Sequence, residues 1–260
     1  MDVVNGKTYV ETHKKVKTIL VSQPKPERSP YYELEKKYEL QIDWVPFIQV
    51  EVLTAKDFRK QRIRPDEFSS VIFMSKNSID HFFTVCEEMR VKMSQDTKYF
   101  CQTDAVANYL QKFIIYRKRK VFAGERSIQD LKSYFMKHKE KEKFLLPCSN
   151  LGAKQITSVL DDYGINYQEA IMYNVVSSDL SHLKDIYYDI IAFFSPLEIE
   201  ALYENFPGFE QKATRIAIFG QSALKAVLDR GLHPNIKAPE PEVPSMTMAL
   251  EKYLQVSNKE

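Results

Sequence analysis

The sequence predicts an α/β protein built from two lobes with parallel sheets. A strand that stops at a serine and turns into a helix, Phe73–Asp80, recurs about 120 residues later as Phe193–Glu200. Tyr99–Thr103 recurs as Ile218–Ser222 at nearly the same offset. Short β-rich runs also alternate with amphipathic stretches, and a parallel crossover needs a helix to return the chain. The pattern favours two similar lobes facing a shared cleft; unrelated βα turns that merely look alike are the alternative.

The first fifty or so residues are expected to start a sheet and then leave it. A β-rich run at Thr18–Ser22 precedes a helix near Arg28–Lys37. The extended stretch Ile42–Val52 is too long for one ordinary strand and carries Pro46, which cannot donate to a ladder, so we expect a break there. Residues 1–16 are polar, lack an apolar h-region, and are expected to be a frayed tail.

The rest of the chain continues the alternation. Further strands are predicted at Ser70–Ser75, Lys98–Cys101, Phe144–Cys148, Asn166–Ser177, Asp189–Ser195 and Arg215–Phe219. Helices are predicted up to about Glu88 and Leu110, over Leu151–Tyr163 with Gly164 as a left-handed cap, and from about Ser245 to Leu254.

The two long extended stretches suggest a discontinuous domain. In this interpretation residues 1–46 and 177–260 form one lobe and residues 47–176 the other, with linkers near 45–52 and 170–178. A continuous two-domain split near Ser177 is the alternative.

Composition excludes several classes of partner. The net charge of the 260 residues is only +2 and the charges are mixed, so we expect no nucleic-acid partner. No apolar run approaches the roughly 20 residues that cross a bilayer, so no membrane partner is expected. The widely spaced Cys86, Cys101 and Cys148 fit neither a thiolate metal site nor an even disulfide framework. We expect a cytoplasmic protein, and a monomer.

The motifs exclude further chemistry. None of the seven glycines forms a Gly-x-Gly-x-x-Gly or Walker loop, which argues against the usual nucleotide cofactors. The five histidines sit singly, without a second ligand at helical or turn spacing, so we expect no metal. Cys148 follows a strand, but nothing near it lowers a thiol pKa, and a small apolar role is favoured.

Hydroxyls and amides instead gather where the predicted parallel strands end. Taken singly, each such residue is expected to cap the helix that follows it. Taken together, they lie at the carboxyl ends of strands, where α/β sheets bind ligands and helix N-termini favour anions. These candidate ligand-binding residues are Ser75, Asn77, Gln102, Thr103, Ser149, Asn150, Ser195, Gly220, Gln221 and Ser222.

Several motifs in a fixed order carry a resemblance to a known family. They are Ile19–Pro24, the Phe-x-Ser turns at Phe73 and Phe193, Phe144–Asn150, Tyr163-Gly164, Ile171–Val176, Ile218–Gly220, Gly231-Leu232 and Ala238–Pro241. From Thr18 to Leu254 the pattern resembles uroporphyrinogen-III synthase. The resemblance implies two flavodoxin-like lobes joined by a two-stranded β linker, with the active site in the cleft.

The resemblance also implies a reaction, with no cofactor and no metal. The linear tetrapyrrole hydroxymethylbilane, as substrate, loses the hydroxyl of ring A as water, ring D attacks through a spiro intermediate, and the macrocycle closes with ring D inverted. The family's candidate for direct participation corresponds to Tyr173, whose phenol stays protonated at neutral pH and can donate toward the leaving hydroxyl. An ordinary aromatic strand residue is the alternative for Tyr173.

The sequence departs from the family's Gly-x-x-Thr-Ala repeats. By sequence alignment Cys101 takes the glycine position and Asp104 the threonine position in the first copy, and Ala223 replaces threonine in the second. We expect Asp104 to cap a helix. The basic run Arg117–Lys120 is interpreted as a solvated strand flank. Alternative functions are a non-catalytic two-lobed protein that binds small anions and a degenerate flavodoxin-like interaction domain.

Overall fold

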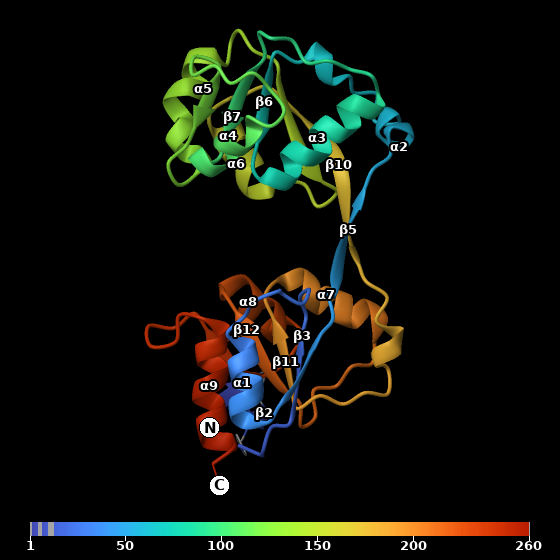
Figure 1. The fold of residues 1–260 in the computed structure, drawn as a ribbon, viewed down its shortest axis with the longest axis vertical. Helices are drawn as coiled ribbons and strands as arrows, with labels where there is room; N and C mark the ends of the chain where they lie inside the picture. Colours follow the sequence, from blue (N-terminus) through green and yellow to red (C-terminus); the bar gives the residue numbers. More distant parts are fainter. Residues whose placement is uncertain (1, 5–6, 10–12, 260) are drawn as a thin grey trace. The chain divides into compact units, whose positions relative to one another are not determined.

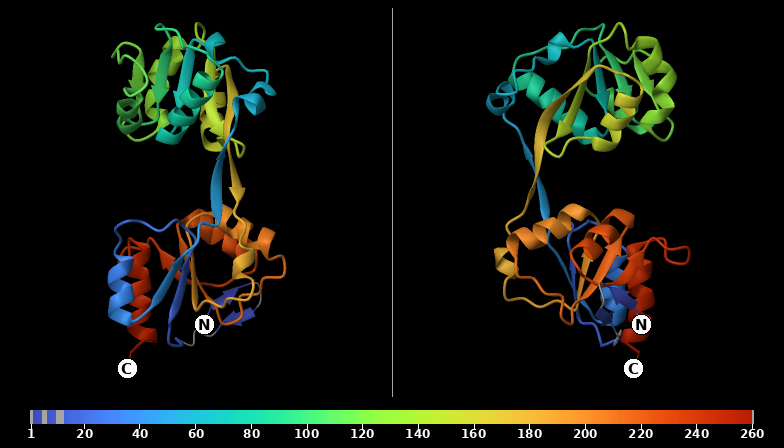
Figure 2. Two further views of the ribbon diagram at one scale, coloured as in Figure 1. Left: turned by 45° about the vertical axis from the view of Figure 1, so that its right-hand side comes forward. Right: turned by 180° about the vertical axis from the view of Figure 1, so that it is seen from behind.

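The structure, a computed structural model, describes residues 2–4, 7–9 and 13–259. Contacts divide it into two compact units: unit 1 runs up to Gln49 and resumes at Val176, and unit 2 is Val50–Val175. Each unit contains a parallel sheet with helices on both faces (Figures 1 and 2). The predicted start of the second lobe at residue 47 differs, because Phe47 is fully buried in unit 1 with its ring 5.9 Å from that of Phe193.

Unit 1 is a five-stranded sheet in the order β13-β12-β11-β3-β4. All its strand pairs are parallel. Its strands are β3 (Thr18–Val21), β4 (Gln41–Trp44), β11 (Ile190–Phe193), β12 (Arg215–Phe219) and β13 (Pro234–Ala238), and its helices are α1 (Tyr31–Tyr38), α7 (Pro196–Asn205), α8 (Gln221–Asp229) and α9 (Met246–Ser257), with a 3₁₀ turn at Ser181–Leu183.

Alternation along the strands of unit 1 builds two cores, one on each face. Ile190 and Ala192 face α1 and α9, whereas Ile191 and Phe193 face α7 and α8. Successive strand residues point to opposite faces, so a strand buried on both sides reads as a continuous apolar run.

Unit 2 contains a six-stranded sheet in the order β5-β10-β9-β6-β7-β8. The strands are β5 (Ile48–Val52), β6 (Ser70–Phe73), β7 (Lys98–Cys101), β8 (Val121–Ala123), β9 (Phe144–Ser149) and β10 (Tyr167–Ser177), and the helices are α2 (Ala55–Arg59), α3 (Lys76–Glu88), α4 (Asp104–Leu110), α5 (Lys132–His138) and α6 (Lys154–Asp162), with 3₁₀ turns at Pro65–Glu67 and Ile128–Leu131. Neighbours β5 and β10 each contain a unit boundary, which confirms the two-stranded β linker. Pro46 lies between the end of β4 and the start of β5, which confirms the predicted break.

The two sheets share one strand order, circularly permuted. If the strands of unit 1 are numbered 1 to 5 in chain order from β3, they lie side by side in the flavodoxin-like order 2-1-3-4-5, which is β4-β3-β11-β12-β13. Unit 2 has the same order if the count starts at β9 and continues through β10 to β6, β7 and β8. The repeated strands β6 and β11 therefore occupy equivalent places, and so do β9 and β3.

The second half of the sequence repeat is aligned differently in the structure. Phe73 pairs with Cys101, and its equivalent Phe193 pairs with Ile218. Thr103 therefore corresponds to Gly220, and each is the N-cap of the next helix. The sequence alignment of Cys101 with Gly220 was wrong by two residues, because a shift of two leaves the side-chain alternation of a strand unchanged.

This shift also corrects the expected role of Asp104. Thr103 caps α4, and Asp104 is its first residue, where a carboxylate favours the helix dipole without being the cap.

Some element ends differ from the prediction. The helix expected from Leu151 begins at Lys154, because Gly152 has φ +69°, which an α-helix cannot contain. Gly164, with φ +64°, follows that helix as predicted. The C-terminal helix continues to Ser257.

The expected frayed tail is only partly within the described residues. Residues 1, 5–6 and 10–12 lie outside them. The strands β1 (Asp2–Val4) and β2 (Lys7–Tyr9) pair antiparallel, so these segments are not frayed. Val16 is buried, and its N–H donates to Asn258 Oδ1 at 2.9 Å.

Candidate functional site

Each sheet has a point where the strand order reverses, and predicted residues lie beside it. In unit 2 this point falls between β9 and β6, at Ser149 and Ser75; in unit 1 it falls between β3 and β11, at Ser22 and Ser195. Open α/β sheets bind ligands in the crevice at the carboxyl ends of these strands. The topology therefore points to the carboxyl edge of each sheet as the place for a functional site.

At the edge of unit 2, two of the predicted hydroxyls cap helices. Ser75 Oγ accepts from the backbone N–H of Ser78 at 3.1 Å, and Thr103 Oγ1 accepts from Val106 N–H at 3.4 Å. Asn77 is an exposed residue in the first turn of α3, and Gln102 lies half-buried just before Thr103. The caps hold the first turns of α3 and α4 at this edge.

The register of β10 on β9 brings Tyr173 to the same edge. Tyr173 pairs with Ser149, the last residue of β9, and the register shifts between Ile171 and Tyr173. Asn150 holds the two strands together: its N–H donates to Tyr173 O at 3.1 Å, its Oδ1 accepts from Val175 N–H at 2.8 Å, and its Nδ2 donates to Val175 O at 3.3 Å. The Asn150 side chain therefore clamps the strand that carries Tyr173.

Tyr173 lies against a histidine that sequence reasoning had treated as isolated. The rings of Tyr173 and His81, on α3, are 4.8 Å apart between centroids. Burial raises the pKa of Tyr173 above 10.0, with the nearby Cys148 adding to the effect, and burial lowers the pKa of His81 below 6.5 against the opposing influence of Asp80. Both rings are therefore uncharged at neutral pH. No motif spacing marks His81, since α3 and β10 lie far apart in the sequence.

At the edge of unit 1, a buried carboxyl holds the turn after β11. Glu198 is 3% exposed, and its Oε2 accepts from the N–H of Phe194 at 2.5 Å and of Ser195 at 3.2 Å. Ser22 Oγ lies 2.7 Å from the same oxygen and donates to Ala192 O at 2.8 Å. Sequence reasoning missed Ser22, which directly follows β3. It also missed Glu198, although Ser195 and Glu198 have the S-x-x-E spacing of a capping box.

Gly220 begins the second helix at this edge. Its φ of +88° lies in the region that favours glycine, and its N–H donates to Ala238 O at 2.6 Å. Gln221 and Ser222 are the first two residues of α8, and both are exposed.

Glu198 is expected to make the stability of the protein depend on pH. Burial raises its pKa above 4.5 and outweighs the hydrogen bonds that lower it. Because the folded-state pKa exceeds the unfolded one, the stabilising contribution is complete below pH 4.5 and is lost as pH rises through the raised pKa. Glu198→Gln keeps an acceptor oxygen without the charge, so its unfolding free energy should fall less than that of the unchanged protein as the pH rises above 4.5. Urea denaturation at several pH values tests this; parallel curves for the two proteins contradict it.

Within residues 2–4, 7–9 and 13–259, no group of three or more His, Cys, Asp or Glu side chains is placed to bind a metal ion. Across these same ranges, no helix combines the length and the apolar character needed to cross a membrane.

Comparisons with known proteins assign the family. The family model described as uroporphyrinogen-III synthase HemD matches residues 31–248. The fold is similar to that of uroporphyrinogen-III synthetase from Helicobacter pylori (TM-score 0.57, 16% identity, 92% of this chain and 99% of that one). It is also similar to a mutant uroporphyrinogen III synthase from the extremely thermophilic bacterium Thermus thermophilus (TM-score 0.55, 11% identity, 92% of this chain and 99% of that one). No curated protein matches by sequence. The chain belongs to the uroporphyrinogen-III synthase family, cyclising lyases of haem biosynthesis that act on hydroxymethylbilane.

Proposed function

We propose that Tyr173 assists the departure of the ring A hydroxyl when this uroporphyrinogen-III synthase closes hydroxymethylbilane. The observation that carries the proposal is the register of β10, which places a half-buried tyrosine beside Ser149 at the switch point of the unit 2 sheet. The phenol, with its pKa raised by burial, keeps its proton at neutral pH and can donate a hydrogen bond. His81 packs against its ring and limits its movement.

The reaction requires positioning more than strong acid–base chemistry. The C–O bond of the ring A hydroxymethyl group breaks as electrons from the ring A pyrrole expel hydroxide, which accepts a hydrogen bond from Tyr173. The hydroxide becomes water with the proton that ring D loses when the macrocycle has closed, so Tyr173 keeps its own proton. Ring D then attacks through the spiro intermediate, and the product is uroporphyrinogen III with ring D inverted. The main task of the protein is to fold and orient a flexible substrate.

The substrate carboxylates are proposed to meet the first turns of helices at the carboxyl edges. In unit 2 these are the turns that include Ser75, Asn77, Gln102 and Thr103; in unit 1 they include Ser195, Gly220, Gln221 and Ser222. Backbone N–H groups and the positive end of the helix dipole favour anions without a basic patch. Ser149 supports this edge, and Asn150 contributes through its clamp on β10.

The protein is further proposed to act as a cytoplasmic monomer, without a metal, a cofactor, a nucleic acid or a membrane as partner. Cys86, Cys101 and Cys148 are free and buried, which is consistent with a reducing compartment. Light scattering after gel filtration tests the monomer. The comparisons give no support to the alternative of a non-catalytic anion-binding protein.

A coupled assay tests the function. Hydroxymethylbilane is generated in place, the product is oxidised, and the porphyrin isomers are separated chromatographically. Type III isomer above the level of a buffer control is the expected result. Type I alone, the isomer that forms by spontaneous closure, would show that the protein does not catalyse the reaction.

A further inference from the structure

A cavity lies in unit 2, away from the carboxyl edge. It has a volume of about 670 Å³ and is enclosed by α3, the segment 90–97 before β7, and the segment 113–121 before β8. Thr97 and Val121 on its wall stand at the amino ends of β7 and β8, whereas Tyr173 lies at the carboxyl edge. Small-molecule ligands occupy cavities of roughly 300–1,000 Å³. The cavity therefore has the size of a ligand site and shares no residue with the proposed active site.

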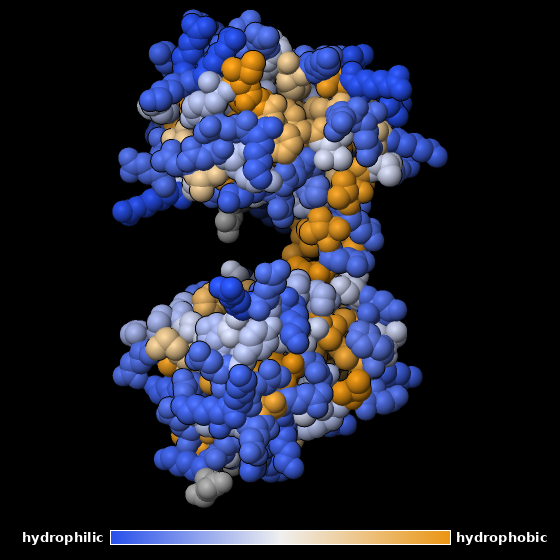
Figure 3. Space-filling model, in the orientation of Figure 1, coloured by the Kyte–Doolittle hydropathy of each residue, from blue (hydrophilic) through white to orange (hydrophobic). Residues whose placement is uncertain are grey.

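The lining of this cavity is largely apolar. The stacked rings of Phe83 and Phe113 are 4.8 Å apart between centroids. Cys86 and Tyr99 line the interior and are 3% and 4% exposed. Ile115 is 76% exposed beside them, and Figure 3 shows apolar surface on the face of unit 2 where α3 lies. An apolar ligand body would remove this surface from water.

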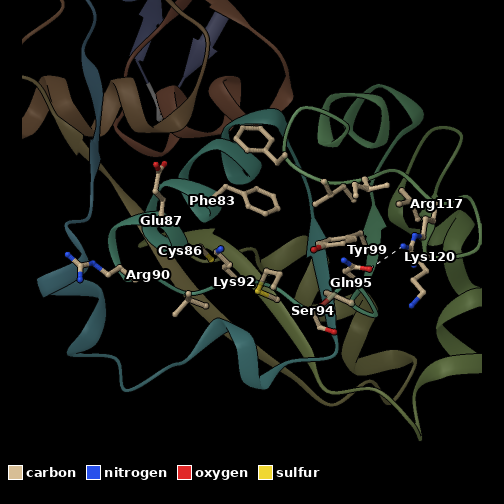
Figure 4. Close-up of a pocket in the computed structure, with 17 residues that line it drawn as sticks. Phe83, Cys86, Glu87, Arg90, Lys92, Ser94, Gln95, Tyr99, Arg117 and Lys120 are labelled. Atoms are coloured by element: carbon tan, nitrogen blue, oxygen red, sulfur yellow. Dashed lines mark hydrogen bonds between the residues drawn. The ribbon is translucent and has the colours of Figure 1, made fainter.

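Basic side chains stand around the apolar lining. Arg90, Lys92, Arg117 and Lys120 line the cavity with a single acidic residue, Glu87. Figure 4 shows Arg117 and Lys120 together at one end, and Arg90 and Glu87 at the other. A ligand with one anionic end would meet a net positive charge at the end formed by Arg117 and Lys120.

Arg117 is the cation best placed to receive that anionic end. Its Nη2 donates to the neutral Gln95 Oε1 at 3.3 Å, and it also interacts electrostatically with Asp96, which pairs with Lys120. Lys120 pairs with Asp96, but the Asp96 side chain is 90% exposed, and such surface pairs are weak. A guanidinium can bind a carboxylate through two parallel hydrogen bonds.

We propose that this cavity binds a small amphipathic carboxylate, with its apolar body against Phe83 and Phe113 and its carboxylate on Arg117. The apolar walls disfavour a compact polyanion, which would lose its hydration without enough compensating partners. The proposal gives a ligand-binding role to the start of the basic run Arg117–Lys120. It is independent of the catalytic role of Tyr173.

Calorimetric titration of the whole protein tests the proposal. The probes are dodecanoate, below its micelle concentration, and dodecan-1-ol as its neutral match. Dodecanoate should bind, and Arg117→Gln should weaken its binding about tenfold, as expected for loss of a charge-assisted hydrogen bond. Arg119→Gln is the matched control, because Arg119 is exposed in the same run but does not line the cavity; it should leave the affinity within about twofold. The affinity for dodecan-1-ol should be lower and unchanged by either substitution.

A second variant locates the bound probe. Phe113 is 38% exposed at the cavity, so Phe113→Trp should be tolerated, and its emission should shift on adding dodecanoate. Trp44, in unit 1, supplies a constant background. Absence of dodecanoate binding, equal affinity for the two probes, equal effects of the two arginine substitutions, or binding without an emission shift would each overturn the proposal. Cyclisation by Arg117→Gln should stay within about twofold of the unchanged protein, because Arg117 lies outside the proposed active site.

Discussion

Tyr173→Phe is expected to lower kcat for formation of uroporphyrinogen III by about 10²-fold while the protein stays folded. The substitution removes only the phenolic oxygen and keeps the ring that packs against His81. A positioned proton donor contributes roughly 10²–10⁴-fold, and we take the lower end because the electron-rich pyrrole ejects the hydroxyl with little help. Steady-state kinetics and the ratio of type III to type I isomer measure the effect. KM should change little, since the helix N-termini that we propose bind the substrate carboxylates are untouched.

Tyr167→Phe is the matched control for this experiment. Tyr167 lies on the same strand, but its phenol donates to Asp161 at 3.0 Å near the other end of β10. Its removal should leave kcat unchanged. If Tyr173→Phe cyclises hydroxymethylbilane at the rate of the unchanged protein, Tyr173 has no part in the chemistry, and the alternative of an ordinary aromatic strand residue holds.

Phe73→Ala is expected to lower the free energy of unfolding by about 3–5 kcal/mol. Phe73 is fully buried as the last residue of β6. Its ring lies 5.4 Å from that of Phe82 and 6.0 Å from that of Tyr99, measured between centroids. Truncation removes these contacts and leaves a cavity beneath the turn that carries Ser75. Urea denaturation followed by circular dichroism measures the change.

Phe113→Ala tests whether burial causes that loss. Phe113 belongs to the same unit and also stacks on a neighbour, Phe83, but it is 38% exposed. Its truncation should cost clearly less than that of Phe73, because a ring that is 38% exposed buries less apolar surface and its removal leaves no closed cavity. Equal losses for the two substitutions would contradict the assignment of Phe73 to the core of unit 2.

The sequence was informative about the fold wherever local pattern and tertiary packing agree. Doubly buried strands such as Ile190–Phe193 are continuous apolar runs, and the break at Pro46 follows from a missing donor. The same local reasoning failed at the second repeat. The alternation of side chains along β7 and β12 fits two alignments of these strands equally well. Only the pairing of β7 with β6 and of β12 with β11 decides between them.

The sequence also predicted only part of the candidate site. Ser75 and Thr103 could be placed at helix starts, because capping depends on neighbouring residues in the chain. Their grouping at one edge depends on strand order, which the sequence does not display, and the circular permutation of unit 2 hides it further.

By itself, the sequence determined the alternation of strands and helices, the two copies of the strand–serine–helix unit, and the motifs that resemble the synthase family. Only the tertiary structure decided that Tyr173 lies beside Ser149 and His81, that Glu198 meets Ser22, and that α3 lines a cavity together with basic side chains. The physical reason is that these contacts join residues far apart in the chain. Their proximity comes from β-sheet register and helix packing, which act between segments, whereas propensity, capping and turn chemistry act within them.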